Sequence, residues 1–272
     1  MAALLRDLAE QAPDHVAVTG DLTNLALPAE YSAAAAWLRD LGSPEDISVV
    51  PGNHDAYIAT APAETHDLWT PWTRGDDGQP GYPYLRRRGR VSLIGASTAV
   101  PTLPFQASGR LGPAQLHRLD TLLRREGAAG RRRVLLLHHP PQPGVVGVRK
   151  GLRDAPALRA LLAETGAELV LHGHMHLPMR HALPGPNGDI PVLGAGSGSL
   201  VGHGGRPAAQ YHLLTLTSEG TGASEGPGAS EGPGASEGTR VDVVSRGYDP
   251  ARGAFAETGR ERLALPGRAS AA

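Results

Sequence analysis

Several features are missing from this sequence, and each absence narrows what the chain can be. Its 272 residues include no cysteine, which excludes disulfides, thiolate metal ligands and cysteine nucleophiles. No apolar run approaches the roughly 20 residues that span a bilayer. The N-terminus also lacks the basic region and apolar core of a secretory signal. We therefore expect a cytoplasmic protein with no membrane contact.

An excess of charge of one sign is missing as well. The 26 basic and 27 acidic residues nearly cancel and leave a formal net charge of −1. Without a global basic field, binding to nucleic acid is not expected. The basic residues are nearly all arginine, with Lys150 as the sole lysine. Two arginine triplets, at 86–88 and 131–133, are expected to be solvated loop charge.

What is present fits a single α/β domain over residues 1–272, with enough apolar residues for one core. Apolar periodicity predicts helices at 1–11, 28–41, 113–125 and 155–164. Strands are predicted at 16–18, 47–50, 91–94, 134–137, 169–171, 190–193, 211–216 and 241–244. Residues 56–90 are expected to form an irregular loop that Trp69 and Trp72 pack.

The insert at residues 218–238 is made largely of the hexapeptide Gly-Ala-Ser-Glu-Gly-Pro, which begins at Gly222 and runs three times. It contains no apolar residue larger than alanine, so it cannot bury enough surface to offset the entropy of ordering. We expect a disordered insert between the last two predicted strands. Such an insert costs little, because loop-closure entropy grows only logarithmically with length.

Polar motifs follow four of the predicted strands. They are Gly20-Asp21, Gly52-Asn53-His54-Asp55, His138-His139-Pro140-Pro141 and Gly173-His174-Met175-His176. In α/β sheets the loops at the carboxyl ends of strands converge on one crevice. We therefore expect these side chains to meet in space, although about 155 residues separate the first motif from the last.

The residue types in these motifs are suited to a pair of divalent ions. Two such ions about 3.5–4 Å apart can clamp a phosphate and generate hydroxide at neutral pH. Asp21 is the candidate bridging carboxylate, and Asn53 can supply an amide oxygen. Imidazole nitrogens are available from His138, His174 and His176. Without cysteine, this donor set suits Mn, Fe, Zn or Co.

The remaining polar residues of the motifs suggest supporting roles. His54 is adjacent to Asn53, so it is better suited to act as an acid near the leaving-group oxygen than to share the metal. Asp55 is expected to hold the tautomer of His54. His139 and His172 are expected to support the ligands or the fold.

The order of the motifs, GD, GNHD, HxP and GHxH, resembles the calcineurin-like metallophosphoesterases. It is most similar to small bacterial members related to class III cyclic-nucleotide phosphodiesterases. The resemblance covers nearly the whole chain and includes Gly109-Arg110-Leu111 and Gly247-Tyr248-Asp249. It implies a four-layer αββα sandwich of two mixed sheets flanked by helices, with a dinuclear site at the edge of the sheets.

The resemblance also implies a role for each candidate residue. Asp21 would bridge both metals, and His176 would belong to the first. His54 would donate a proton, and Asn24 would line the substrate site. The second metal would be completed by Asn53, His138 and His174.

The start of the sequence departs from the family pattern. Family members open with a strand that ends in Asp-x-His, whereas this sequence begins inside a predicted helix. Asp7 lies in mid-helix, and Asp14-His15 are adjacent rather than spaced. Two interpretations follow. Either the natural protein has a further N-terminal strand, or the chain is whole and holds its first metal only through Asp21 and His176.

Together the residues and the resemblance predict a dinuclear, metal-dependent phosphoesterase. It would hydrolyse a phosphodiester by attack of a metal-bound hydroxide, and a cyclic nucleotide is one candidate substrate. The expected partners are two metal ions and a small phosphoester, and the oligomeric state is left open. One alternative is a phosphomonoesterase or nuclease of the same fold. The other is an inactive metal-binding or interaction module that lacks the first metal site.

Overall fold

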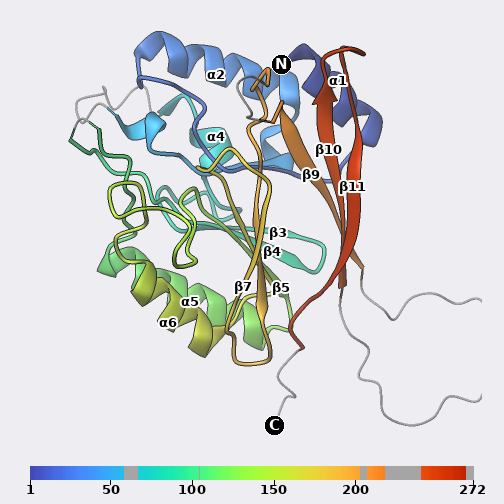
Figure 1. The fold of residues 1–272 in the computed structure, drawn as a ribbon. Coiled ribbons are helices and arrows are strands. Elements are labelled where there is room, and N and C mark those ends of the chain that lie inside the picture. Colours follow the sequence, from blue (N-terminus) through green and yellow to red (C-terminus); the bar gives the residue numbers. More distant parts are fainter. Residues whose placement is uncertain (58–66, 104, 203–206, 218–239, 268–272) are drawn as a thin grey trace, which may run out of the picture.

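Two layers of strands pack face to face, and helices cover both outer sides (Figure 1). The computed structural model describes residues 1–57, 67–103, 105–202, 207–217 and 240–267. The repeat insert predicted at 218–238 lies outside these residues. The four layers confirm the predicted mixed α/β architecture. No helix in the described ranges is long and apolar enough to cross a membrane.

The larger layer is a six-stranded mixed sheet in the order β3-β4-β5-β6-β8-β7. The four central strands are parallel, and both edge strands are antiparallel to their neighbours. The strands are β3 (Tyr84–Arg88), β4 (Val91–Gly95), β5 (Arg132–Leu136), β6 (Leu169–His172), β7 (Met179–Leu183) and β8 (Ile190–Gly194).

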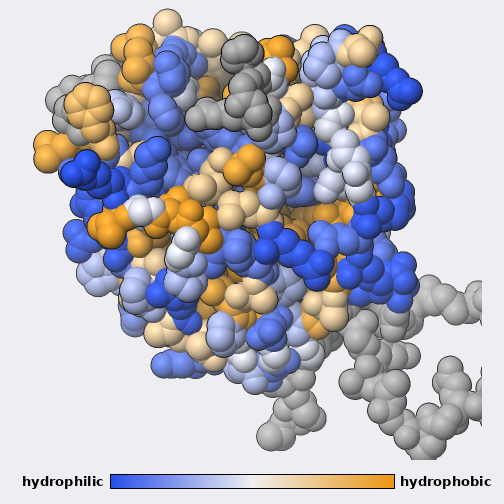
Figure 2. Space-filling view, viewed as in Figure 1, coloured by the Kyte–Doolittle hydropathy of each residue, from blue (hydrophilic) through white to orange (hydrophobic). Residues whose placement is uncertain are grey.

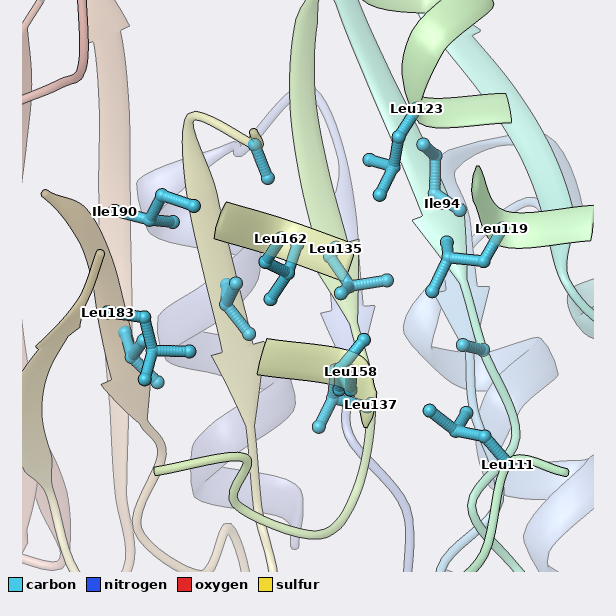
Figure 3. Packing of buried hydrophobic residues seen from close by; sticks show 14 of the residues in the cluster. Ile94, Leu111, Leu119, Leu123, Leu135, Leu137, Leu158, Leu162, Leu183 and Ile190 are labelled. Carbon is cyan, nitrogen blue, oxygen red and sulfur yellow. The ribbon is translucent and has the colours of Figure 1, made fainter. Parts of the chain in front are cut away.

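Two helices cover the outer face of this sheet, α5 (Pro113–Ala128) and α6 (Ala155–Thr165). Figure 3 shows Leu119 and Leu123 of α5 beside Ile94, and Leu158 and Leu162 of α6 beside Leu135. These side chains come from alternate strand positions and from one stripe of each helix, as a two-residue strand period and a 3.6-residue helix period require.

The smaller layer consists of two groups of strands. The parallel pair is β1 (Val16–Val18) with β2 (Ile47–Val49). The antiparallel group is β9 (Gln210–Thr217), β10 (Arg240–Asp249) and β11 (Ala254–Ala264). Both groups contribute to one core against the large sheet, where Ala17 and Val243 share a cluster with Leu136.

The helices of the fourth layer cover these two groups. The α2 helix (Pro28–Leu41) packs Tyr31 and Leu38 onto β1 and β2. The α1 helix (Ala2–Gln11) packs Leu4 onto the β9–β11 group. The remaining elements of the described residues are short: the 3₁₀ helices η1 (Pro44–Asp46) and η2 (His54–Ala56), and the helix α4 (Thr70–Thr73).

Every helix and strand predicted from the sequence is present, with ends that differ by a few residues. Trp69 and Trp72 are buried beneath the loop, as expected. Three strands are additional, namely β3, β7 and β11. Their sequences are polar, for example Tyr-Leu-Arg-Arg-Arg in β3, because edge positions leave one side open to solvent.

The prediction that both arginine triplets are solvated loop charge is wrong. Arg86 lies in β3 and donates to the carbonyl oxygens of Arg74 and Pro71 at 2.9 and 2.8 Å. Arg133 lies in β5 and forms a buried ion pair with Glu168, with Nη2 and Oε1 2.7 Å apart. Buried guanidinium groups need such partners, and periodicity does not reveal partners that lie far away in sequence.

Candidate metal centre

The four motifs converge at the edge where the two strand layers meet. Gly20-Asp21 follows β1 and Gly52-Asn53 follows β2, both in the smaller layer. His138 follows β5, and His174 follows β6 in the large sheet. The parallel register aligns the carboxyl ends of each pair. Residues from two different sheets therefore face one another across the interface.

Three electron-pair donors lie close enough together to bind one metal ion placed between them. Asn53 Oδ1 is 2.9 Å from His174 Nδ1 and 3.2 Å from His138 Nε2, and these two nitrogens are 3.2 Å apart. Asp21 Oδ2 lies 3.3 Å from His138 Nε2. Ligands bound at about 2.1 Å to one ion are separated by roughly 3 Å. We call these four residues the cradle.

The tautomers of the two histidines direct lone pairs into the cradle. His138 Nδ1 is 2.7 Å from the carbonyl oxygen of Thr19, which can only accept, so Nδ1 carries the hydrogen. The His174 ring binds the backbone of Lys150, and burial lowers the pKa of His174 to about 4. Both inward-facing nitrogens are therefore free to bind a cation.

The charges in the cradle favour a cation at its centre. Burial acts to raise the pKa of Asp21, but the neighbouring His138 and His176 rings hold it well below the usual range. Burial likewise acts to lower the pKa of His138, yet Asp21 raises it. A divalent ion would compete with protons for the same donors.

His176 approaches the other side of Asp21. Its Nε2 lies 4.0 Å from Asp21 Oδ2, just under the combined length of two metal–ligand bonds of about 2.1 Å. The His176 side chain is 43% exposed, whereas that of His138 is 1% exposed. Among the described residues, this second position has two donors and the cradle has four.

His139 lies beside the cradle but is not available as a ligand. The three rings of His138, His139 and His174 cluster closely, with potential donor atoms within 4.8 Å of one another. However, His139 Nδ1 is 2.7 Å from Thr98 Oγ1, and its Nε2 is 3.0 Å from the Ala107 carbonyl. Both nitrogens are thus engaged. The ring supports the loop beneath the cradle, as the sequence suggested.

Asp55 does not hold the tautomer of His54, so this part of the sequence prediction is wrong. Its carboxylate accepts the backbone N–H groups of Asp21, Gly52 and Thr23, each at 2.8 Å. Burial raises the pKa of Asp55, and these N–H groups oppose the rise. Asp55 therefore ties together the two loops that carry Asp21 and Asn53.

The tautomer of His54 is set by Asn24 instead. His54 Nδ1 is 2.7 Å from the backbone carbonyl oxygen of Asn24, so Nδ1 donates and Nε2 is left free. The Asn24 residue is exposed, and its described contacts are made by its main chain. His54 also stacks on Tyr57, with ring centroids 5.7 Å apart. The backbone N–H of His54 donates to Asp21 Oδ1 at 3.0 Å.

Backbone strain is concentrated at the motifs. Six non-glycine residues in the described ranges have positive φ, and three of them are Asp21, His174 and His176, at 59°, 68° and 56°. Each costs on the order of 1–3 kcal/mol and persists only where its surroundings enforce it. Gly52 is also required, because a Cβ there would lie 2.1 Å from Asp21 Oδ1.

A cavity of about 270 Å³ opens beside the second motif. It is bounded by Pro51, Asp55 and Ala56 on one side and by Ser97 and Ala99 on the other. Its remaining walls combine aromatic rings and hydroxyl groups, from Trp69, Thr70, Thr73 and Tyr82, with Asp67. A small molecule bound there would have both apolar and hydrogen-bonding surface within reach.

Comparison with known proteins is consistent with this geometry. A family model described as calcineurin-like phosphoesterase matches residues 1–178. A probable cyclic nucleotide phosphodiesterase of Synechococcus sp. is 31% identical over 181 residues, covering 64% of this chain and 62% of the relative. A cAMP/cGMP dual specificity phosphodiesterase of Mycobacterium tuberculosis is 30% identical over 172 residues, covering 60% and 49%. The chain thus spans about half to two thirds of these relatives.

A solved structure shares the fold. A dimetal phosphatase from Danio rerio superposes with a TM-score of 0.56 and 13% sequence identity, covering 72% of this chain and 77% of that protein. At this identity the likeness concerns the arrangement of helices and strands. It agrees with the layered architecture described above.

Proposed function

Because the chain belongs to the calcineurin-like phosphoesterase family, we propose that it is a metal-dependent hydrolase of a small phosphodiester, with a cyclic nucleotide as a candidate substrate. Two relatives named as cyclic-nucleotide phosphodiesterases support this substrate class. The cavity beside the second motif offers aromatic and hydroxyl-bearing walls to a small organic group.

One observation carries the proposal. Asn53 Oδ1, His138 Nε2 and His174 Nδ1 lie within 2.9–3.2 Å of one another, with the Asp21 carboxylate alongside. Buried electron-pair donors held this close together are unfavourable unless a metal ion or a proton lies between them. The donor set of one carboxylate, one amide oxygen and two imidazoles suits Mn, Fe, Zn or Co.

Each residue then has a chemical task. Metal ions bound at such a site lower the pKa of water and neutralise phosphate charge. The cradle residues fix the position of the phosphate, and Asp55 maintains the spacing of the two loops. His54 keeps its Nδ1 hydrogen on the Asn24 carbonyl, so when the ring is protonated its Nε2 would carry the proton that passes to the leaving oxygen.

Metal content tests the cradle. We expect the purified chain to retain divalent ions through dialysis and to hydrolyse bis(p-nitrophenyl) phosphate. Asp21→Ala should release the ions and abolish hydrolysis, because Asp21 faces both positions. Elemental analysis and turnover should be measured on the same samples. Full metal occupancy in Asp21→Ala would refute the bridging role.

The role of His54 calls for a separate variant. His54→Ala should lower turnover by about 10²–10⁴-fold while the metal content stays unchanged. His54→Gln, which has no acid at this position, should be equally slow. A substrate with a good leaving group should lose less activity, since it needs little protonation. Loss of metal in His54→Ala would show that His54 helps to hold the metal, and would contradict its assignment as proton donor.

A second candidate function rests on the uneven metal positions. Among the described residues only Asp21 and His176 reach the second position. A chain that held one ion in the cradle could act as a metal-binding module without hydrolysis. One ion per chain and no turnover would favour this candidate, whereas two ions with turnover would favour the hydrolase.

A further inference from the structure

Two loops beside the cradle carry a surface that the proposed hydrolysis does not use. One follows β4 and covers residues 97–111, and the other follows β5 and covers residues 142–153. Residue 104 is outside the described ranges. The loops are joined, because Ala107 N–H binds the carbonyl of Arg149 at 2.9 Å and Gly109 N–H binds that of Gly151 at 3.1 Å.

The joined loops reach the metal centre through Lys150 and His139. The backbone of Lys150 is hydrogen-bonded to the His174 ring, and the Ala107 carbonyl binds His139 Nε2 at 3.0 Å. The surface formed by these loops, which we call the rim, therefore borders the cradle directly.

The rim presents large apolar side chains to solvent. Phe105 is 92% exposed, Val148 is 93% exposed and Leu103 is 69% exposed. Figure 2 shows hydrophobic side chains at the left margin of the molecule, beside strongly hydrophilic ones. Figure 1 places the loops after β4 and β5 on that side. These side chains are largely exposed, which suits contact with a deformable lipid surface.

The charge of the rim has one sign. Residues 97–111 and 142–153 contain the exposed Arg110, Arg149, Lys150 and Arg153, and no aspartate or glutamate. Within the described part of the chain, the first three of these form no ion pair. The next acid, Asp154, is turned inward onto the N–H groups of Leu111 and Gly112 at 3.0 and 2.7 Å. The net charge of −1 conceals this local excess.

We propose that the rim docks the chain onto an anionic membrane surface. Phe105, Val148 and Leu103 would enter the boundary between headgroups and acyl chains, and the arginines and Lys150 would contact lipid phosphates. Apolar side chains beside unpaired basic ones match the two attractions that hold peripheral proteins to such surfaces. The expectation of no membrane contact rested on the lack of a membrane-spanning run and of a signal sequence, and neither bears on docking through exposed loops.

Vesicle sedimentation tests the proposal without any measurement of hydrolysis. The full chain should sediment with vesicles of phosphatidylcholine and phosphatidylglycerol, and much less with phosphatidylcholine alone. High salt should reduce binding, because exposed charges are screened. Phe105→Ser should weaken binding about tenfold or more, since one buried phenylalanine contributes this much. Phe105→Leu should retain most of the binding.

Charge variants provide the matched controls. The double variant Arg149→Gln with Lys150→Gln should weaken binding, whereas Arg124→Gln, an exposed arginine of α5, should not. Metal content should stay unchanged in Phe105→Ser, so a failed hydrolase proposal would leave this test intact. Equal binding by Phe105→Ser and the parent chain would overturn the proposal. So would dimerisation through Phe105 without vesicle binding, which would assign the rim to a second copy.

Discussion

The cradle and the Arg133–Glu168 pair both bury charged groups between elements distant in sequence, but they satisfy these groups in opposite ways. Arg133 donates to Glu168 from Nε and Nη2 at 3.1 and 2.7 Å and to the Thr165 carbonyl at 2.7 Å. Each charge meets its complement. In the cradle, Asn53, His138 and His174 instead bring acceptors together.

This difference distinguishes buried polar groups that serve the fold from buried polar groups that serve a ligand. A self-satisfied cluster contributes to the fold and needs no ligand, whereas acceptors placed against acceptors are stable only with a cation between them. Positive φ occurs at Asp21 and His174 of the cradle and at the adjacent His176, whereas Arg133 and Glu168 have ordinary backbone angles. The three predictions below test this contrast, beginning with the largest expected effect.

Breaking the self-satisfied pair should have the largest effect on stability. Glu168→Ala leaves Arg133 buried without its carboxylate, which typically costs about 3–5 kcal/mol of unfolding free energy. Urea denaturation followed by circular dichroism would measure the change.

The double variant Arg133→Met with Glu168→Met removes both charges and should recover most of the loss. Glu257→Ala removes an exposed partner of Arg260 and should have little effect on stability. A similar loss in Glu168→Ala and Glu257→Ala would contradict the importance of burial. If a variant of a cradle residue lowered the unfolding free energy of the metal-free protein as much as Glu168→Ala does, the contrast between the cradle and the Arg133–Glu168 pair would be wrong.

A second carboxylate cluster makes stability depend on pH. Glu126 is buried, and hydrogen bonds from Arg87 lower its pKa from 4.5 to about 2. Because the folded state binds this proton more weakly, the stabilisation is complete above pH 4.5 and is lost as the pH falls toward 2. Arg87 is half-exposed, so screening limits the effect to about 2 kcal/mol.

Urea denaturation at several pH values would measure this dependence. Glu126→Gln should unfold more easily at neutral pH, and the difference from the parent chain should shrink as the pH falls toward 2. Asp242→Asn, at an exposed pair with Arg262, controls for acidity in general. An undiminished difference at low pH would show that Glu126 contributes through packing and not through its charge.

The sequence predicted the part of this molecule that rests on local pattern. Helices such as 28–41 and strands such as 16–18 follow from apolar periodicity. The convergence of Asp21, Asn53, His138 and His174 follows from motifs at strand ends. Their roles as metal ligands stay a prediction, as does the substrate-binding role of Asn24.

What escaped prediction depends on partners distant in sequence. Burial of Arg86 relies on carbonyl groups supplied by other loops, and the task of Asp55 relies on N–H groups near Asp21. The contacts that set the tautomers of His138 and His54 come from the carbonyls of Thr19 and Asn24. Every residue has a backbone carbonyl, so the residue type at a position does not indicate whether its carbonyl makes such a contact.

The smallest predicted effect is a gain in stability, opposite in sign to the loss expected for Glu168→Ala. His176 has φ of 56° and a side chain that is 43% exposed, so little packing is lost on its removal. His176→Gly should stabilise the metal-free chain by about 1 kcal/mol, because glycine adopts this backbone without strain. Ala12→Gly, at φ of 45° at the end of α1, should give a similar gain. Only His176→Gly should also weaken metal binding, and chelator titration with thermal unfolding measures both quantities. If His176→Gly destabilised the metal-free chain, its strained backbone would serve the fold, and the distinction between the cradle and the arginine pair would fail.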